Sequence, residues 1–229
     1  ALGFHYLVEA AWGADFVAYL EAQELAEKKF LTSSCCPAFV SFIKKNYPAL
    51  KENVSHNLSP MAHMAMMIKK KNPTAKIIFI GPCIAKRKEA QRDECVDYVL
   101  TFEELHPIFR GLGIELEQAN LYKVAYESVC EAHGFAQAGG VAGAVKAYLG
   151  PKANGIKIMQ FSDFTKKNIG VLRAYAKTGK VDAQFIEMMA CEGGCVTGPS
   201  AHNDPVAGKR QLNQDLLKRT LKYENNNQE

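Results

Sequence analysis

The sequence has no long hydrophobic run, no basic stripe and no regular array of cysteines. No apolar segment approaches the roughly 18 residues that a membrane-spanning helix needs, so no membrane span is expected. Its 28 basic and 24 acidic residues leave a net charge of only +4, and no basic stripe is interleaved with aromatic residues, which argues against nucleic-acid binding. No secretory signal is visible, and the 7 cysteines form no short, evenly spaced framework. A reduced, cytoplasmic protein with metal-binding or redox cysteines is therefore expected.

Local signals along the chain alternate between strand and helix. Ser59 and Pro60 predict the start of a helix, because serine caps helices and proline fits their first turn. Residues 75–83 form a short apolar run that is typical of a buried parallel strand. Thr101 and Glu104 form a capping box that starts a helix after another strand. The alternation predicts an α/β fold of two lobes, with mostly parallel sheets flanked by helices.

Two smaller expectations concern packing. The first long helix is expected to use Phe16, Leu20 and Leu25 as one face, from their spacing. Cys95 and Cys130 stand alone and are interpreted as small core residues. No repeat and no linker divides the 229 residues.

Four other cysteines lie at the ends of predicted elements, beside proline or glycine. Cys36 precedes a proline, Cys83 follows one, and Cys191 and Cys195 flank a glycine-rich turn. Ligands gather at strand ends in open α/β sheets, and glycines let the backbone wrap closely around a bulky group. Three separate loops that supply one, one and two thiolates suit an iron–sulfur cluster in the cleft between two lobes. A four-thiolate zinc site, or simple packing, stays open from the spacing alone.

Three segments together resemble one family. They are TSSCCPAFV (32–40), GPCIAKRKE (81–89) and FIEMMACEGGC (185–195), in the family's order. They resemble the signature segments of the catalytic domain of iron-only ([FeFe]) hydrogenases. The residues of the first two segments are similar to those of a less-studied branch of this family. The resemblance implies that residues 1–229 form this domain, incomplete at its N-terminal side. The polar tail 222–229 is expected to fray.

The resemblance implies a six-iron cofactor, the H-cluster, and the reversible reduction of protons to H2. A 4Fe-4S cluster would be held by Cys36, Cys83, Cys191 and Cys195. Cys195 would also bridge to a two-iron subcluster that carries CO, cyanide and a bridging dithiolate. The implied partners are H2 and protons, a ferredoxin or an iron–sulfur electron-transfer domain or subunit, and maturation proteins.

The resemblance also implies a proton path that begins at Cys35, which would be a proton shuttle and no ligand. Glu21 and Glu24 lie three residues apart, hence on one helix face. Together with Ser55 they match the family's relay from thiol to glutamate, serine, glutamate and surface. Without the resemblance, two glutamates that merely solvate an exposed helix face are the simpler interpretation.

Five residues are implied to surround the two-iron subcluster. Lys86 would donate a hydrogen bond to a cyanide ligand, because an ammonium is a compact donor for a small anion. Phe135 and Met189 would form an apolar wall, with Pro60 and Pro82 nearby. A plain core role is the alternative for Met189.

Departures from the family bear on the pocket and on the function. Gly81 stands where many relatives have Met, and Met61 where they have Gln, which predicts a looser or differently polar pocket. Two other functions stay open: a hydrogenase-like sensor, and a non-enzymatic iron–sulfur assembly factor that binds only a 4Fe-4S cluster. The relay residues argue against the sensor, and Lys86, Cys35 and Phe135 would lack a purpose in the assembly factor.

Overall fold

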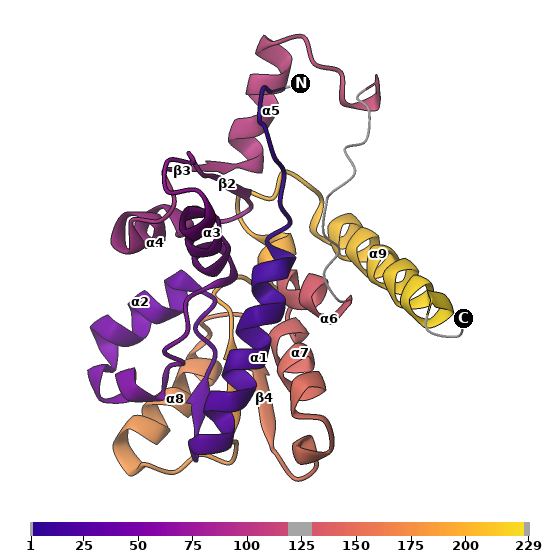
Figure 1. Cartoon of the computed structure of the whole chain (residues 1–229). Coiled ribbons are helices and arrows are strands. Elements are labelled where there is room, and N and C mark those ends of the chain that lie inside the picture. Colours follow the sequence, from indigo (N-terminus) through magenta and orange to yellow (C-terminus); the bar gives the residue numbers. More distant parts are fainter. Residues whose placement is uncertain (1, 119–129, 227–229) are drawn as a thin grey trace.

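The computed structural model describes residues 2–118 and 130–226 and has two sheets surrounded by helices (Figure 1). One sheet has the strand order β1-β5-β4, the other pairs β2 with β3, and every pairing is parallel. The α/β class predicted from the alternation of elements is confirmed. The strands are β1 (Leu31–Thr32), β2 (Ile78–Gly81), β3 (Tyr98–Thr101), β4 (Ile158–Phe161) and β5 (Phe185–Met188).

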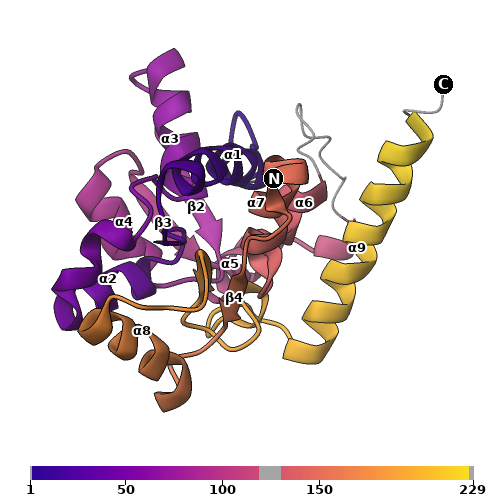
Figure 2. The ribbon, with the colours of Figure 1, turned by 90° about the horizontal axis from the view of Figure 1, so that it is seen from below.

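Helices cover both sheets, and short 3-10 turns join several of them (Figure 2). The α-helices are α1 (Ala11–Glu27), α2 (Pro37–Asn46), α3 (Pro60–Lys71), α4 (Lys86–Asp93), α5 (Phe102–Gly111), α6 (Cys130–His133), α7 (Gly140–Leu149), α8 (Lys166–Thr178) and α9 (Pro205–Asn226). The 3-10 turns are η1 (Pro48–Asn53), η2 (Leu116–Gln118), η3 (Gly134–Ala136), η4 (Gly150–Ala153) and η5 (Cys195–Thr197).

The predicted start signals act as expected. The side chain of Ser59 accepts a hydrogen bond from the Ala62 amide at 3.4 Å, so it caps α3. Thr101 and Glu104 form both bonds of a capping box, at 3.2 Å and 2.8 Å, at the start of α5. These caps fix where the helices begin relative to the strands that precede them.

The buried face of α1 differs from the expected one. Phe16 is 44% exposed and Leu20 is half-buried, whereas Leu25 is buried. The cause is a close crossing of α3, in which a side chain at Gly13 would meet the Pro60 carbonyl oxygen at 2.3 Å. A crossing this tight favours small residues at the contact. The buried positions of α1 are Gly13, Ala14, Val17, Ala18, Glu21, Ala22 and Leu25.

The remaining expectations on packing and the tail have mixed outcomes. Cys95 is buried at 8% exposure in a cluster with residues of α3, while the side chain of Cys130 lies outside the described part of the chain. α9 runs away from the body and stays helical through Asn226, so 222–226 are part of a helix; 227–229 lie outside the described residues (Figure 1). Within the described chain, no helix combines the length and apolar character that a bilayer crossing requires.

Candidate functional site

The first and third signature segments leave the same end of one sheet. β1 pairs in parallel with β5, so the chain after Thr32 and the chain after Met188 emerge side by side. The Ser33 amide donates to the Ile186 carbonyl at 3.0 Å, and the Met188 amide donates to the Ser33 hydroxyl at 3.2 Å. This register brings Cys35 and Cys36 towards the turn that carries Cys191.

The second segment joins them from the other sheet. It follows β2, and the ammonium of Lys86 donates to the Cys35 carbonyl at 3.3 Å. A side chain at Gly198 would stand 3.0 Å from the Pro82 carbonyl oxygen, so the third segment passes close to the second. Cys83 lies between these two contacts in the sequence. The three predicted segments are thus brought together at one place.

The four candidate ligand thiols act on one another electrostatically. Burial, and after it the charges of Cys36 and Cys83, raise the pKa of Cys195 to about 12. The same two neighbours raise the pKa of Cys191, after burial as the main cause. Burial also raises the pKa of Cys36, with a further contribution from Cys83. Thiols in such surroundings become thiolates only when a cation compensates their charge.

The turn between Cys191 and Cys195 is shaped by two glycines. Gly193 has φ +79° and Gly194 φ +103°, which L side chains rarely adopt. A side chain at Gly194 would meet the Cα of Gln137 at 2.6 Å. The turn therefore packs directly on the segment that carries Phe135.

The predicted apolar wall is brought to the same region. Phe135 and Met189 are buried in one core cluster, at 9% and 2% exposure, and Cys35 packs against this cluster. Pro82 lies beside Gly198, as described above. Pro60 begins α3, where its carbonyl contacts α1, and it is only half-buried.

The first glutamate of the predicted relay is fully buried. Glu21 has 0% exposure, so the interpretation of a solvated helix face is wrong for this residue. Its Oε1 accepts from the Ser34 amide at 3.1 Å, while its Oε2 has no hydrogen-bond partner among the described residues. Burial raises the pKa of Glu21 to about 8, against hydrogen bonds from Ser34 and Ser55 and with help from the charge of Glu24. Burial and then the charge of Glu21 raise the pKa of Cys35.

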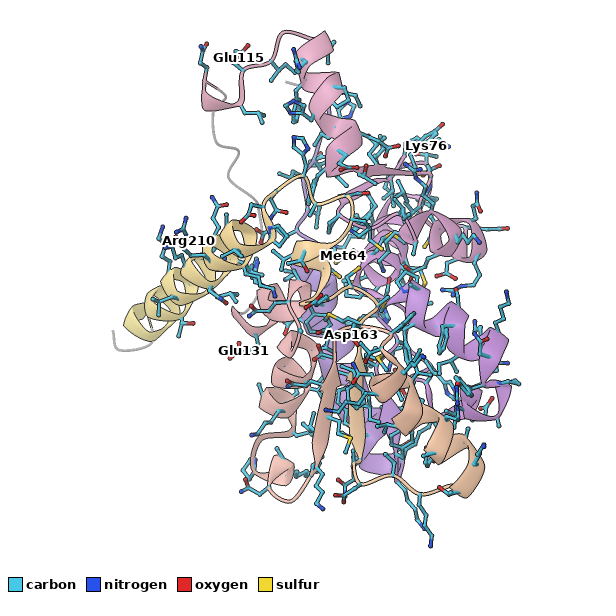
Figure 3. The ribbon with its side chains drawn as sticks, turned by 180° about the vertical axis from the view of Figure 1, so that it is seen from behind. Met64, Lys76, Glu115, Glu131, Asp163 and Arg210 are labelled. Carbon is cyan, nitrogen blue, oxygen red and sulfur yellow. The ribbon has the colours of Figure 1, made fainter. Side chains whose placement is uncertain are left out.

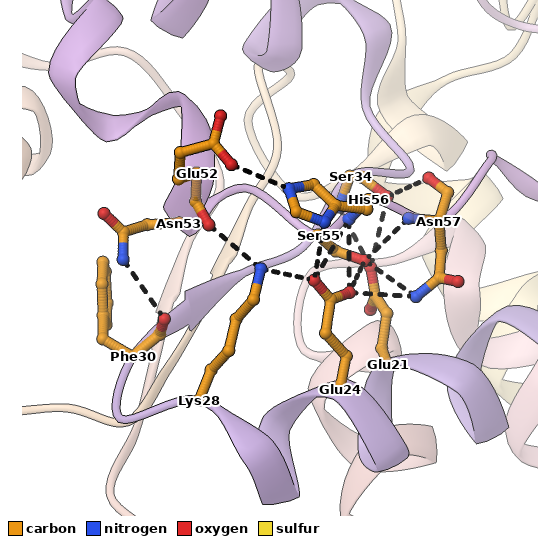
Figure 4. A network of polar contacts seen from close by, with 10 residues as sticks. All are labelled: Glu21, Glu24, Lys28, Phe30, Ser34, Glu52, Asn53, Ser55, His56 and Asn57. Carbon is orange, nitrogen blue, oxygen red and sulfur yellow. Dashed lines mark hydrogen bonds and ion pairs between the residues drawn. The ribbon is translucent and has the colours of Figure 1, made fainter.

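Ser55 and Glu24, the next residues of the predicted relay, lie close to Glu21 (Figure 4). The Ser55 hydroxyl donates to Glu24 Oε2 at 2.8 Å and also lies close enough to Glu21 to lower the pKa of that carboxyl. Glu24 Oε1 pairs with the Lys28 ammonium at 2.7 Å, and the Glu24 side chain is 14% exposed. The structure therefore brings the predicted residues together, between the region of the Cys35 thiol and the partly exposed Glu24.

Lys86 is buried and has three acceptors. Its ammonium donates to Glu89 Oε2 at 2.6 Å, to the Ser59 hydroxyl at 2.9 Å and to the Cys35 carbonyl at 3.3 Å. Its relative exposure is 8%. A buried ammonium with a carboxylate partner is held rigidly, because breaking the pair would leave an uncompensated charge.

The space beside Gly81 is filled from within the same strand. A side chain there would stand 2.8 Å from the ring of Phe79. The Phe79 ring therefore occupies the space next to the Gly81 α-carbon, while the expected looser or differently polar pocket stays a prediction. Met61 is buried at 3% exposure in the cluster with α3 and α4 residues.

The sequence did not indicate the site contacts of four residues. Ser34 binds Glu21, Ser59 and Glu89 bind Lys86, and the carboxylate of Glu187 accepts from the amides of Gly139 and Ala142 at 2.7 and 2.8 Å. Glu89 follows Lys86 by three residues, the same helix spacing that linked Glu21 with Glu24, so it could have been predicted. Glu187 could not, because its partners at the start of α7 lie more than 40 residues away in the chain.

Residues 1–199 match the family described as iron only hydrogenase large subunit, C-terminal domain. The chain belongs to this family, which is the one that the three segments resemble.

Individual relatives are similar over much of the chain. Iron hydrogenase 1 of Clostridium pasteurianum is 28% identical over 86% of this chain and 43% of its own length. The cytosolic Fe-S cluster assembly factor NAR1 of Kluyveromyces lactis is 33% identical over 43% of the chain and 21% of its own length. The chain thus spans less than half of these two relatives. A variant of [FeFe]-hydrogenase HydA1 from Chlamydomonas reinhardtii has the same fold, with a TM-score of 0.73 and 21% identity, over 94% of this chain and 75% of that one.

Proposed function

We propose that the chain is the catalytic domain of a cytoplasmic [FeFe]-hydrogenase, which interconverts protons and electrons with H2. The observation that carries the proposal is the fully buried Glu21 carboxylate, which acts electrostatically on the Cys35 thiol, next to a Ser55 hydroxyl that donates to Glu24 at 2.8 Å. A protein that only holds a cluster has no need of a buried carboxylate with a pKa of about 8 beside a free thiol.

The residues present fit the proposed cofactor. Cys36, Cys83, Cys191 and Cys195 would hold the 4Fe-4S cluster, and Cys195 would also bridge to the two-iron subcluster. Among residues 2–118 and 130–226, no three His, Cys, Asp or Glu side chains are grouped closely enough to bind a single ion. Ligands of one zinc ion must crowd within bond length of one centre, whereas cluster ligands bind separate irons, so the zinc alternative is not favoured. When bound, the six-iron group supplies the redox chemistry that joins electrons to protons.

The chain's own part is to hold and move protons. The pKa of Cys35 is raised, so its thiol is neutral near pH 7 and can give up and recover a proton. Glu21, with a pKa of about 8, is poised to exchange that proton, and the Ser55 hydroxyl connects it to Glu24. The Lys28 ammonium lies at the outer end of this path.

The pocket residues would orient and shield the two-iron subcluster. Lys86 is the proposed donor to a cyanide ligand, while Phe135 and Met189, with Pro60 and Pro82 nearby, would keep water out. H2 and protons are the proposed substrates. A ferredoxin, or an iron–sulfur domain or subunit, is the proposed electron partner, and maturation proteins would supply the two-iron subcluster.

An assembly factor that binds only a 4Fe-4S cluster is the second candidate, because NAR1 is among the similar proteins. A sensor that turns over slowly is the third. Both would use the same four cysteines, so cluster binding alone does not separate the three functions.

The test is infrared spectroscopy and H2 turnover of protein that has been matured under anaerobic conditions. Sharp CO and cyanide bands together with rapid turnover are expected. Cys35→Ala is expected to lower turnover by at least 100-fold with the 4Fe-4S signal intact, because it removes the first proton carrier. Cys36→Ala is the matched control, and it should lose the 4Fe-4S signal.

Other outcomes point elsewhere. Full loading of iron and sulfide without CO or cyanide bands would favour the assembly factor. Bands with slow turnover in the unaltered chain would favour the sensor. Equal loss of the cluster in both cysteine variants would mean that the roles of Cys35 and Cys36 are exchanged.

A further inference from the structure

Lys209, at the start of α9, is placed on the turn that joins two of the candidate cluster ligands. The position that a side chain would take on Gly193 lies 2.2 Å from the Lys209 ammonium nitrogen and 2.4 Å from its Cε. The head of the lysine therefore lies directly over the α-carbon of Gly193, between Cys191 and Cys195. A larger residue at position 193 would displace the head of Lys209, and the φ of +79° favours glycine there as well.

The start of α9 is built to hold Lys209 there. Asp204 caps the helix, since its carboxylate accepts from the Ala207 amide at 2.8 Å. Gly208 packs against Asn203, whose side-chain nitrogen would be 1.8 Å from any added Cβ. α9 begins ten residues after Cys195, so these contacts fix the position of the Lys209 backbone relative to the turn.

The charge of Lys209 is not neutralised by another side chain. Among residues 2–118 and 130–226, no carboxylate forms an ion pair with it, although other cations of the same helix do pair, such as Arg219 with Asp215 at 2.8 Å. Glu192, the acidic residue of the turn, is exposed and makes no ion pair with Lys209 within the same described part of the chain. Lys209 is exposed to solvent, and its unpaired ammonium lies on the backbone of the turn between Cys191 and Cys195.

We infer that Lys209 raises the reduction potential of the cluster held by Cys191 and Cys195. A cluster bound by four thiolates is anionic, and reduction adds one more negative charge. A nearby positive charge stabilises the reduced form more than the oxidised form, which moves the potential in the positive direction. This inference rests on the proposed function only in so far as that function requires the 4Fe-4S cluster.

The test is a redox titration of the 4Fe-4S-loaded protein, followed by electron paramagnetic resonance. Lys209→Met is expected to shift the midpoint potential to a more negative value, because it keeps the stem and removes the charge. Lys209→Arg should preserve the potential. The matched control is Arg210→Met, which removes the same charge one residue along α9, at the edge of the molecule (Figure 3). Higher salt should reduce the Lys209 effect, since the ammonium is solvent-accessible.

Each outcome decides the inference. A shift in Lys209→Met that is several times larger than in Arg210→Met supports it. Equal shifts in the two variants, or no shift in Lys209→Met, overturn it. The measurement needs no H2 turnover, so a loaded chain that never turns over would contradict the proposed hydrogenase and leave the role of Lys209 standing. A chain that binds no cluster would contradict both.

Discussion

Glu21 shows how burial alone changes the chemistry of a common side chain. It lies on α1 with no exposed surface, among alanines and a leucine. The groups that face it are the Cys35 thiol, the charge of Glu24 and the hydroxyls of Ser34 and Ser55. Because no cation is among these neighbours, the carboxyl retains its proton to about pH 8.

This raised pKa predicts a specific pH dependence of stability. Between about pH 4.5 and 8 the unfolded chain releases the Glu21 proton while the folded chain keeps it. The contribution of Glu21 to the free energy of unfolding is therefore fully present below pH 4.5 and is lost as the pH rises to about 8. At roughly 1.4 kcal/mol per pKa unit, the loss amounts to about 3 to 5 kcal/mol.

Glu21→Gln is expected to remove that dependence, since glutamine cannot ionise. The measurement is the free energy of unfolding in urea at several pH values, for both proteins without cluster. The difference between them should grow in favour of the variant from pH 5 to pH 8. Parallel curves across this range would mean that Glu21 is already ionised in the folded chain.

At the scale of elements, the crossing of α1 and α3 determines where Glu21 and the α3 cap lie. Gly13 allows α1 to touch the Pro60 carbonyl, which begins the helix that Ser59 caps. Ser59 in turn accepts from Lys86. A wider crossing would thus move an acceptor of the buried ammonium as well as the relay.

Gly13→Ala is expected to destabilise the protein by about 1 to 3 kcal/mol, because the added Cβ must push the two helices apart. Gly143→Ala on α7 is the matched control, since nothing lies within 4 Å of its Cβ position. That change should be neutral or stabilise by up to about 1 kcal/mol, through helix propensity. Chemical denaturation of both variants is the measurement. Equal changes in the free energy of unfolding for the two variants would show that the crossing of α1 and α3 can accommodate a Cβ at Gly13.

The elements also show what the sequence could and could not predict. The helix caps at Ser59 and Thr101 depend on neighbours within four residues and are predicted correctly. The apolar run 75–83 does contain a parallel strand, β2, but that strand is mostly only partly buried. The buried face of α1 depends on a distant partner, Pro60, and is predicted wrongly at Phe16.

In the site too, local features are predictable from the sequence, whereas contacts between distant segments are not. Periodicity and caps indicate strand ends with cysteines, whereas the ligand set and the relay are predictions that only the resemblance implies. The contacts of Glu187 and Lys209 join segments far apart in the chain, so no local pattern indicates them.

At the scale of the whole molecule, the candidate ligands come from both sheets. Cys83 follows β2, whereas the other three cysteines follow β1 and β5. A cluster that bridges them binds only when both lobes are folded and in place. Binding should therefore stabilise the complete molecule, as any ligand of the native state does.

Loading with a 4Fe-4S cluster is expected to raise the Tm by roughly 5 to 10 °C, from a few kcal/mol of binding free energy in a chain of this size. Calorimetry before and after iron removal by a chelator is the measurement, and removal should restore the lower Tm. Cys36→Ser should abolish the difference, while Cys95→Ala, away from the site, should keep it. The same Tm with and without cluster would mean that the metal does not connect the lobes.

Lys86 has a consequence for how this site is filled. Its three N–H groups already donate to three acceptors on three different segments of the chain: Glu89, Ser59 and the Cys35 carbonyl. A ligand that accepts a hydrogen bond from this nitrogen must displace one of these three acceptors. Binding of the ligand would therefore exchange one hydrogen bond for another. The hydrogen bond to the Cys35 carbonyl is the longest of the three, at 3.3 Å, so breaking it costs the least free energy. Occupation of the pocket would then loosen the backbone next to the Cys35 thiol, the residue proposed to carry protons.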